Sequence, residues 1–374
     1  MKSIAMAQIA DRRIEKIEME VPRVGPAEGL LRVEACGLCG SDVEQFNGLL
    51  ARNNTVQYPI IPGHEPVGII EEIGPEAEAN WGVRKGDRVA IAGPLNCGRC
   101  DHCLGGTHHL CRSLFATEGF LPAYGLIPTT FGHGLWGGYS EYIHLHPRTL
   151  FCKIPDNVPA RLATMYQALA AGLRWAVAVP ETAMGDTVLV LGCGQRGLAS
   201  VVALKRAGAG RIIVTGLARD SHKLALARQL GATDVIVADR EDVTARVMEI
   251  TAGRGVDVSI DVVPVSGIPI GVAINAVRTG GTIVLAGIKG NPSGIAIDTD
   301  QIVKREITLK GVMTQTYNFY REAVDMLSRD LALLAPMHTH EYALDDVETA
   351  LKVLAGEVPG QQAISISIHP GAIN

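Results

Sequence analysis

Hydrophobic and polar residues follow two different patterns along the chain. Up to about residue 155, short runs typical of β-strands alternate with turns rich in glycine and proline; these runs are 29–35, 67–73, 88–91 and 139–145. This pattern predicts an irregular, mostly β domain.

Beyond Pro155 the strand-like runs alternate with helical stretches instead. Strands are expected over 187–191, 211–215 and 256–262, and helices over 198–207 and 221–230. Strands alternating with helices imply right-handed crossovers and a parallel sheet.

The end of the chain predicts two further helices, 320–327 and 344–354, before a β-like tail, 363–368. The predicted fold class is therefore α/β, with a β-rich domain and a doubly wound parallel-sheet domain. We expect domain limits of 1–158, 159–315 and 316–374, with the last segment returning to the first domain.

Composition and charge narrow the class of protein. With 374 residues the chain exceeds one ordinary domain, and 47% hydrophobic residues with 42 glycines suit an α/β protein. A net charge of −5 without a block of like charges favours neither nucleic acid nor membrane as a partner. The opening MKSIAMAQIADRR lacks the apolar core of a secretory signal, and no run of about 18 apolar residues follows, so we expect a cytoplasmic protein.

A glycine-rich turn points to a dinucleotide. The strand 187–191 leads into Gly192, Gly194 and Gly197 in the pattern GxGxxG, and a helix follows. These glycines permit a tight turn, a close approach of backbone to pyrophosphate, and close packing of helix on strand. The alternative is a turn of no special purpose, but the strands and helix stand where a cofactor site needs them.

Four of the eight cysteines are closely spaced and suit a metal. The pattern Cys97, Cys100, Cys103 and Cys111 can surround one ion tetrahedrally, which predicts a closed structural zinc site. The alternative is four unrelated thiols.

Two further segments, Cys36–Asp42 (CGLCGSD) and 63–68 (GHEPVG), supply a thiolate, an imidazole and a carboxylate. Such a set suits a zinc ion with one position left open for substrate. With KGDRVA at 85–90, GGYSEY at 137–142 and RTGGTIVLAG at 278–287, the chain resembles the zinc-containing medium-chain alcohol dehydrogenases over nearly its whole length.

The resemblance implies a GroES-like catalytic domain, a Rossmann domain, two zinc ions per chain and a homodimer or homotetramer. It implies catalytic zinc ligands at Cys39 and His64, with Glu65 a ligand or close behind. Asp42 would orient the histidine, and Ser41 would relay the alcohol proton. Cys36 matches no ligand and is expected to be buried.

Three positions depart from the family pattern. Gln167 stands where the family has its third zinc ligand, so it is either a weak ligand or a substrate contact, and zinc is otherwise held by Cys39, His64, Glu65 and water. Glu44 replaces a relay histidine. Arg196 is either a phosphate contact or a solvated arginine.

Cofactor choice depends on the end of strand 211–215. Ala218 stands where NAD-specific members carry an acidic residue, while Arg219 and Lys223 follow, which favours NADP. NAD stays open because Asp220 could serve the ribose. The predicted cofactor-binding residues are Gly192, Gly194, Gln195, Arg196, Gly197, Arg219, Lys223, Val262 and Gly287.

The predicted function is oxidation of an alcohol, or reduction of its aldehyde or ketone, with NAD(P). An aromatic segment favours a hydrophobic alcohol if it lines the site, although it could equally pack on its own domain: Phe115, Phe120, Tyr124, Phe131 and Trp136. Glu65 and Gln167 instead favour a polyol or sugar. A non-catalytic NADPH-binding zinc protein and a zinc-free reductase are the weaker alternatives.

Overall fold

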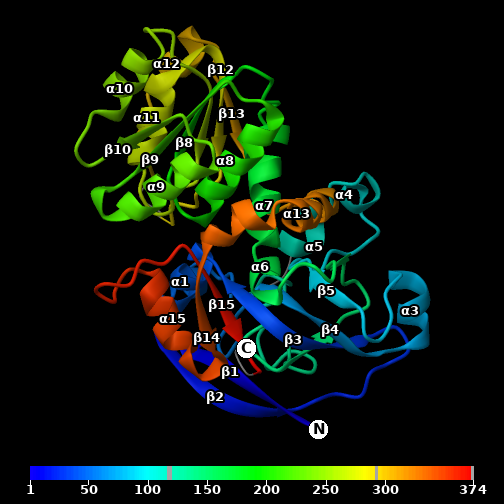
Figure 1. The fold of residues 1–374 in the computed structure, drawn as a ribbon. Coiled ribbons are helices and arrows are strands. Elements are labelled where there is room, and N and C mark those ends of the chain that lie inside the picture. The colour runs from blue at the N-terminus through cyan, green and yellow to red at the C-terminus, as the bar shows by residue number, and fades with distance from the viewer. Residues whose placement is uncertain (116–119, 291–293, 372–374) are drawn as a thin grey trace. The chain divides into compact units, whose positions relative to one another are not determined.

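The computed structural model describes residues 1–115, 120–290 and 294–371. The chain forms two compact units, one of Met1–Gln167 with Thr316–Asn374 and the other of Ala168–Gln315 (Figure 1). The domain limits expected from the sequence stay a prediction. No helix in the described ranges is both long and apolar enough to cross a membrane.

The first unit contains a seven-stranded sheet in the order β14-β15-β3-β4-β5-β7, with β6 also paired to β3. A separate antiparallel pair, β1 and β2, precedes it. The strands are β1 (Lys2–Ala10), β2 (Arg13–Glu20), β3 (Gly29–Leu38), β4 (Glu65–Ile73), β5 (Arg88–Ile91), β6 (Tyr142–Leu145), β7 (Phe151–Lys153), β14 (His338–Ala343) and β15 (Ser365–His369).

Strand β3 is the common element of this sheet. It pairs antiparallel with β4 along its length, with β6 at its beginning and with β15 at its end. The pairing with β15 brings the end of the chain back to the first unit. In the β3/β4 register Gly37 lies opposite Glu65, which fixes the relation between the residues that follow β3 and those that begin β4.

Mostly short helices connect these strands. They are α1 (Gly40–Phe46), α2 (Leu49–Arg52), α3 (Pro75–Trp81), α4 (Asp101–Leu104), η1 (His108–Leu110), α5 (Arg112–Phe115), α6 (Ala160–Ala163), α13 (Tyr317–Arg329), α14 (Leu331–Leu334), η4 (Ala335–Met337), η5 (Leu344–Asp346) and α15 (Val347–Leu354). Helix α7 (Tyr166–Ala171) contains the limit between the units.

The second unit is a parallel six-stranded sheet in the order β10-β9-β8-β11-β12-β13. Its strands are β8 (Thr187–Leu191), β9 (Arg211–Gly216), β10 (Asp234–Val237), β11 (Val256–Asp261), β12 (Val277–Leu285) and β13 (Thr308–Gly311). The order reverses between β8 and β11, and ligands bind at such a switch point in open α/β sheets.

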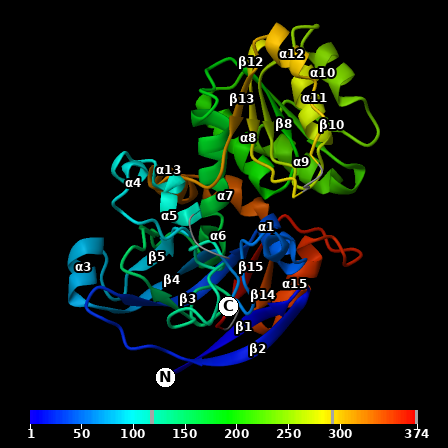
Figure 2. The same cartoon turned by 180° about the vertical axis from the view of Figure 1, so that it is seen from behind.

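Helices connect these parallel strands, with α8 contacting α9 and α10 contacting α11 (Figure 2). They are η2 (Gly172–Ala178), α8 (Gln195–Ala207), η3 (Ala218–Asp220), α9 (Ser221–Leu230), α10 (Val243–Ile250), α11 (Ile268–Ala276) and α12 (Thr299–Lys304). All six residues of β11 are buried, as expected of a central strand covered on both faces.

The predicted fold class is confirmed, and the strand over 187–191 and the helix over 221–230 have the predicted bounds. The prediction did not include β1 and β2. Strand β2 (RIEKIEME) has only exposed and half-buried positions. It contains three glutamates and one lysine, so the apolar pattern that would predict a strand is weak.

Asp257 joins three strands of the parallel sheet. Its carboxylate accepts hydrogen bonds from the Thr187 backbone, at 2.9 Å, and from the guanidinium groups of Arg254 and Arg278. Burial alone would raise the pKa of Asp257, but the arginine hydrogen bonds outweigh burial and lower its pKa to about 2. Ionised Asp257 therefore stabilises the fold.

We predict that Asp257→Asn lowers the free energy of unfolding by about 2 kcal/mol near neutral pH. Because the folded-state pKa is depressed, this contribution is complete above pH ~4 and is lost as the pH falls towards about 2. Urea unfolding at several pH values measures both effects. The control is Asp300→Asn, which breaks an exposed pair with Lys304 and should cost under about 0.5 kcal/mol. Equal losses in the two variants would contradict the prediction.

Candidate metal centres and cofactor-binding turn

Cys39, His64 and Glu65 come together at the junction of β3 and β4. Cys39 directly follows β3, and His64 directly precedes Glu65, the first residue of β4. One ligand atom from each residue lies within 4.8 Å of the other two. Cys39 and Glu65 are 3% and 0% exposed, whereas the His64 side chain is 17% exposed, so solvent can reach the cluster only at the histidine.

Asp42 and Ser41 arrange this cluster. One carboxylate oxygen of Asp42 accepts a hydrogen bond from the Cys39 backbone at 2.8 Å, and the other lies 3.2 Å from His64 Nδ1. His64 Nε2 is thereby directed towards the cluster, where it lies 3.9 Å from Glu65 Oε1. The Ser41 hydroxyl lies 2.9 Å from Cys39 Sγ and 3.4 Å from His64 Nε2.

The surroundings of the cluster favour positive charge. Burial alone would lower the pKa of His64, but Asp42 and Cys39 outweigh burial and raise its pKa well above the usual value. Burial and the negative charge of Asp42 raise the pKa values of Cys36 and Tyr139. A cation is therefore better suited to this place than a further anion. Cys36 is fully buried, as expected, and lies outside the group that could hold a metal.

Gln167 contacts the backbone next to the cluster. Its amide nitrogen donates hydrogen bonds to the backbone carbonyl of His64 and, at 3.2 Å, to the Tyr166 hydroxyl. Since a carbonyl can only accept, the amide nitrogen must be the atom that faces it. Gln167 is 7% exposed and supports the backbone at His64. This contact joins residues 103 positions apart, and no local pattern in the sequence could have indicated it.

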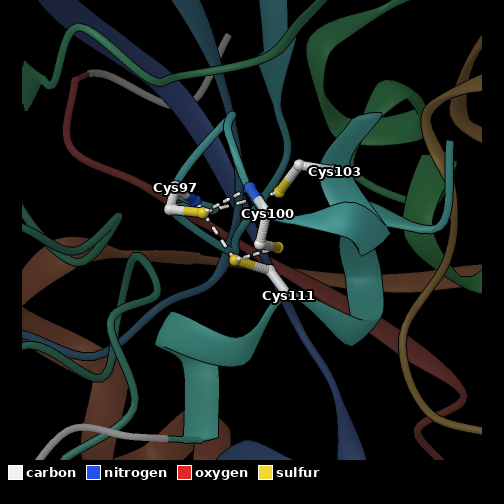
Figure 3. A group of neighbouring side chains, drawn as sticks. All are labelled: Cys97, Cys100, Cys103 and Cys111. Atoms are coloured by element: carbon white, nitrogen blue, oxygen red, sulfur yellow. Dashed lines mark hydrogen bonds between the residues drawn. The ribbon is translucent and has the colours of Figure 1, made fainter. Parts of the chain in front are cut away.

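The four predicted cysteines form one group (Figure 3). Their sulfur atoms lie within 4.8 Å of one another, with Cys97 3.9 Å from Cys103 and Cys100 3.8 Å from Cys111. The Cys97 backbone N–H donates to the Cys111 sulfur, and the Cys100 backbone N–H donates to the Cys97 sulfur. Four converging sulfur donors with backbone hydrogen bonds suit a tetrahedral ion and leave no ligand position open.

The glycine turn lies at the carboxyl end of β8. Gly192 has φ of +106°, a conformation that residues with a Cβ rarely adopt. A Cβ on Gly197 would lie only 2.0 Å from the Gly192 carbonyl oxygen, so only glycine lets α8 begin this close to the strand. Gly194 is exposed and precedes α8, whose first-turn N–H groups can bind a phosphate.

The neighbouring strand ends surround this turn. The Val262 backbone N–H donates to the Leu191 carbonyl at 3.1 Å, and a Cβ on Gly287 would lie 2.1 Å from the Val263 carbonyl oxygen. Gln195 is buried in the first turn of α8. The predicted residues Gly192, Val262 and Gly287 therefore lie just after adjacent strands of one sheet, and Gly197 lies in the first turn of α8 beside them.

Arg196 stacks on an aromatic ring. Its guanidinium lies 5.0 Å from the centre of the Trp175 ring, a cation–π contact that neither of the two sequence-based interpretations included. Trp175 lies in η2, distant in sequence, so the contact could not be predicted from the glycine motif.

The two basic residues predicted to select NADP, Arg219 and Lys223, differ in their ion pairing. Lys223 forms a 2.8 Å ion pair with Asp220, whereas Arg219 is exposed and forms no ion pair within the described parts of the chain. Asp239, which the sequence analysis missed, accepts a 2.8 Å hydrogen bond from the Ala218 backbone. Arg219 is therefore the cation here that is available to a ligand.

The aromatic segment makes ring contacts within its own unit at four of the five predicted residues, and the side chain of Phe115 lies outside the part that the structure describes. Tyr124 and Trp136 are buried in a core with Leu31, and their rings lie 6.2 Å apart. Phe131 is 53% exposed and contacts Phe120 at 5.5 Å between ring centres. These contacts favour the packing interpretation for Tyr124 and Trp136.

Known proteins resemble both units. Residues 25–156 match the family model of the alcohol dehydrogenase GroES-like domain, and residues 197–329 match that of the zinc-binding dehydrogenases. A probable alcohol dehydrogenase of Mycobacterium tuberculosis is 39% identical over 98% of both chains. L-idonate 5-dehydrogenase of Vitis vinifera is 32% identical over 90% of this chain and 87% of its own.

A crystal structure leads to the same family. A candidate zinc-binding dehydrogenase of Sinorhizobium meliloti, bound to NADP, superposes with a TM-score of 0.83 at 25% identity over 99% of this chain and 100% of its own. The chain belongs to the zinc-dependent medium-chain dehydrogenase family and is an NAD(P)-dependent alcohol dehydrogenase.

Proposed function

We propose that Cys39, His64 and Glu65 hold the catalytic zinc ion of this enzyme, and that Cys97, Cys100, Cys103 and Cys111 hold a structural one. The observation that carries the proposal is the convergence of a thiol, an imidazole and a buried carboxylate within 4.8 Å, with Asp42 behind the histidine. A carboxylate behind a ligating histidine is the usual support of zinc sites. The donor types fit zinc at both clusters.

Side chains around the cluster hold the zinc ligands in position and move the substrate proton. Zinc, when bound, lowers the pKa of the substrate hydroxyl. Ser41 relays the hydroxyl proton: its Oγ, which lies beside both Cys39 and His64, accepts this proton while the serine's own proton passes to water. Asp42 holds the imidazole so that Nε2 keeps facing the cluster. Gln167 positions the His64 backbone rather than acting as a ligand.

The glycine turn binds the cofactor, and Arg219 selects it. The N–H groups at the start of α8 bind the pyrophosphate through Gly194, Gln195 and Arg196. The nicotinamide, when bound, accepts the hydride. We infer a preference for NADP, because Arg219 is exposed without an ion pair in the described residues, and NADP is bound in the Sinorhizobium meliloti protein.

The substrate is a primary or secondary alcohol, or the corresponding aldehyde or ketone. A polyol is the second candidate, supported by the buried Glu65 carboxylate in the cluster and by the similarity to L-idonate 5-dehydrogenase. Formation of NADPH and NADH across a panel of simple alcohols, diols and sugar alcohols distinguishes these classes. Turnover of none of them would overturn the catalytic assignment. A cytoplasmic location and a homodimer or homotetramer stay predictions.

We predict two zinc ions per chain that differ in lability. The three-residue cluster leaves a coordination position open, so brief chelation should remove about one zinc ion together with activity. Metal analysis alongside activity tests this. Full activity with no more than one zinc ion per chain would refute it.

The two clusters should also separate by mutation. Cys39→Ala should reduce kcat more than about 100-fold, since a ligand loss exceeds the 10–100-fold effect of losing its support, and should lower the melting temperature less than the change in the other cluster. Cys100→Ser is the matched change in the other cluster and should mainly lower the melting temperature. The reverse pattern would exchange the two roles.

Gln167→Met should keep the catalytic zinc and lower kcat/KM about tenfold, because the variant fills the same space but donates no hydrogen bond to the His64 carbonyl. Zinc content and kinetics are measured together, with Gln361→Met as an exposed control. Loss of the catalytic zinc would show that Gln167 is a ligand.

Arg219→Ala should lower kcat/KM for NADP by an amount equivalent to about 1.5–3 kcal/mol, the usual contribution of a hydrogen bond to a charged group. The value of kcat/KM for NAD should stay nearly unchanged. The control is Arg206→Ala at the far end of α8, which should change neither cofactor. Equal losses for both cofactors, or a parent enzyme that prefers NAD, would refute the assignment.

A further inference from the structure

A third group of metal-binding side chains lies in the first unit, apart from both clusters described above. It consists of Glu28, His133 and His144, and one ligand atom from each lies within 4.8 Å of the other two. The two proposed zinc clusters are defined by the same spacing. Glu28 directly precedes β3, His144 belongs to β6, and His133 lies in the loop before β6.

Strand pairing brings two of these residues together. In the β6/β3 register His144 lies opposite Leu30, and Leu30 is two positions after Glu28 in the sequence. Its Nε2 is 3.3 Å from Glu28 Oε2. The His133 and His144 rings lie 4.6 Å apart between centres, so the loop places its imidazole over this pair.

His144 is the observation that points to a ligand. The residue is 1% exposed, its Nδ1 has no hydrogen-bond partner among the described residues, and its Nε2 has only the 3.3 Å ion-pair contact with Glu28. Buried polar groups without such partners are uncommon and cost free energy. A metal ion bound to one ring nitrogen would compensate for this cost.

The other members are arranged as ligands require. Glu28 Oε2 accepts a 3.0 Å hydrogen bond from the Gly25 backbone, which holds the carboxylate in place. The edge of the Trp136 ring meets His144 at 5.3 Å between centres and shields one side of the group. His133 is exposed, so water and ions can reach the group.

We propose that Glu28, His133 and His144 form a third metal site for a divalent transition-metal ion such as Zn²⁺. Two imidazoles and one carboxylate are donors that zinc and its neighbours in the first transition row prefer, and the absence of sulfur distinguishes this site from the other two. The ion ties the loop that carries His133 to β3 and β6. The proposal does not depend on the proposed function of the other clusters.

The test uses the enzyme with its tightly bound zinc retained. Calorimetric titration with Zn²⁺ should show uptake of one further equivalent, and His133→Ala should weaken this binding at least about tenfold. His133 is exposed, so its replacement leaves the core intact. The matched control is His146→Ala, a neighbouring histidine that stands outside the group, which should bind the extra equivalent as the parent does.

Two further readouts decide the location. Added Zn²⁺ should raise the melting temperature of the parent and not of His133→Ala, because a metal that binds only the folded state stabilises it. Added Co²⁺ should give visible bands without sulfur-to-metal charge transfer. No further uptake by the parent, or equal uptake by His133→Ala, would overturn the proposal and leave Glu28 and His144 as an ion pair only.

Discussion

The pairing of β3 with β4 is the constraint on which the candidate active site depends. Because Gly37 lies opposite Glu65, Cys39 at the end of one strand meets His64 and Glu65 at the start of the other. Side chains alternate between the two faces of a strand, so a slip of one residue would turn Glu65 away from Cys39. Asp42 strengthens the junction, since a single carboxylate contacts both the Cys39 backbone and the His64 ring.

Strand β3 has metal-binding residues at both of its ends. Its last residue leads to Cys39, while Glu28 precedes its first, and β6 sets His144 beside that beginning. Ten residues of extended chain separate these positions by about 30 Å. Strand β3 is thus a rigid spacer that keeps two groups of metal-binding residues apart.

Features whose residues lie close together in the sequence could be predicted from it. The glycine turn, the four cysteines, and the CGLCGSD and GHE segments each lie within about 15 residues, so local spacing carries their geometry. Contacts between distant residues could not be predicted in this way. Gln167 reaches the His64 backbone, and Arg196 reaches Trp175, only because the chain folds as it does. Glu28 and His144 are 116 positions apart, and neither belongs to a motif.

The four-cysteine loop has a consequence for how the protein is made. Three of its cysteines are only half-buried, and its helices α4 and η1 are four and three residues long. Such a segment buries too little apolar surface to hold its shape by itself, so we expect its order to come from the proposed structural zinc ion, whose binding also requires the thiols to lose their protons. Cells grown with scarce zinc, or purification in acid, would then yield a chain whose sheets are folded while this loop is open to proteases.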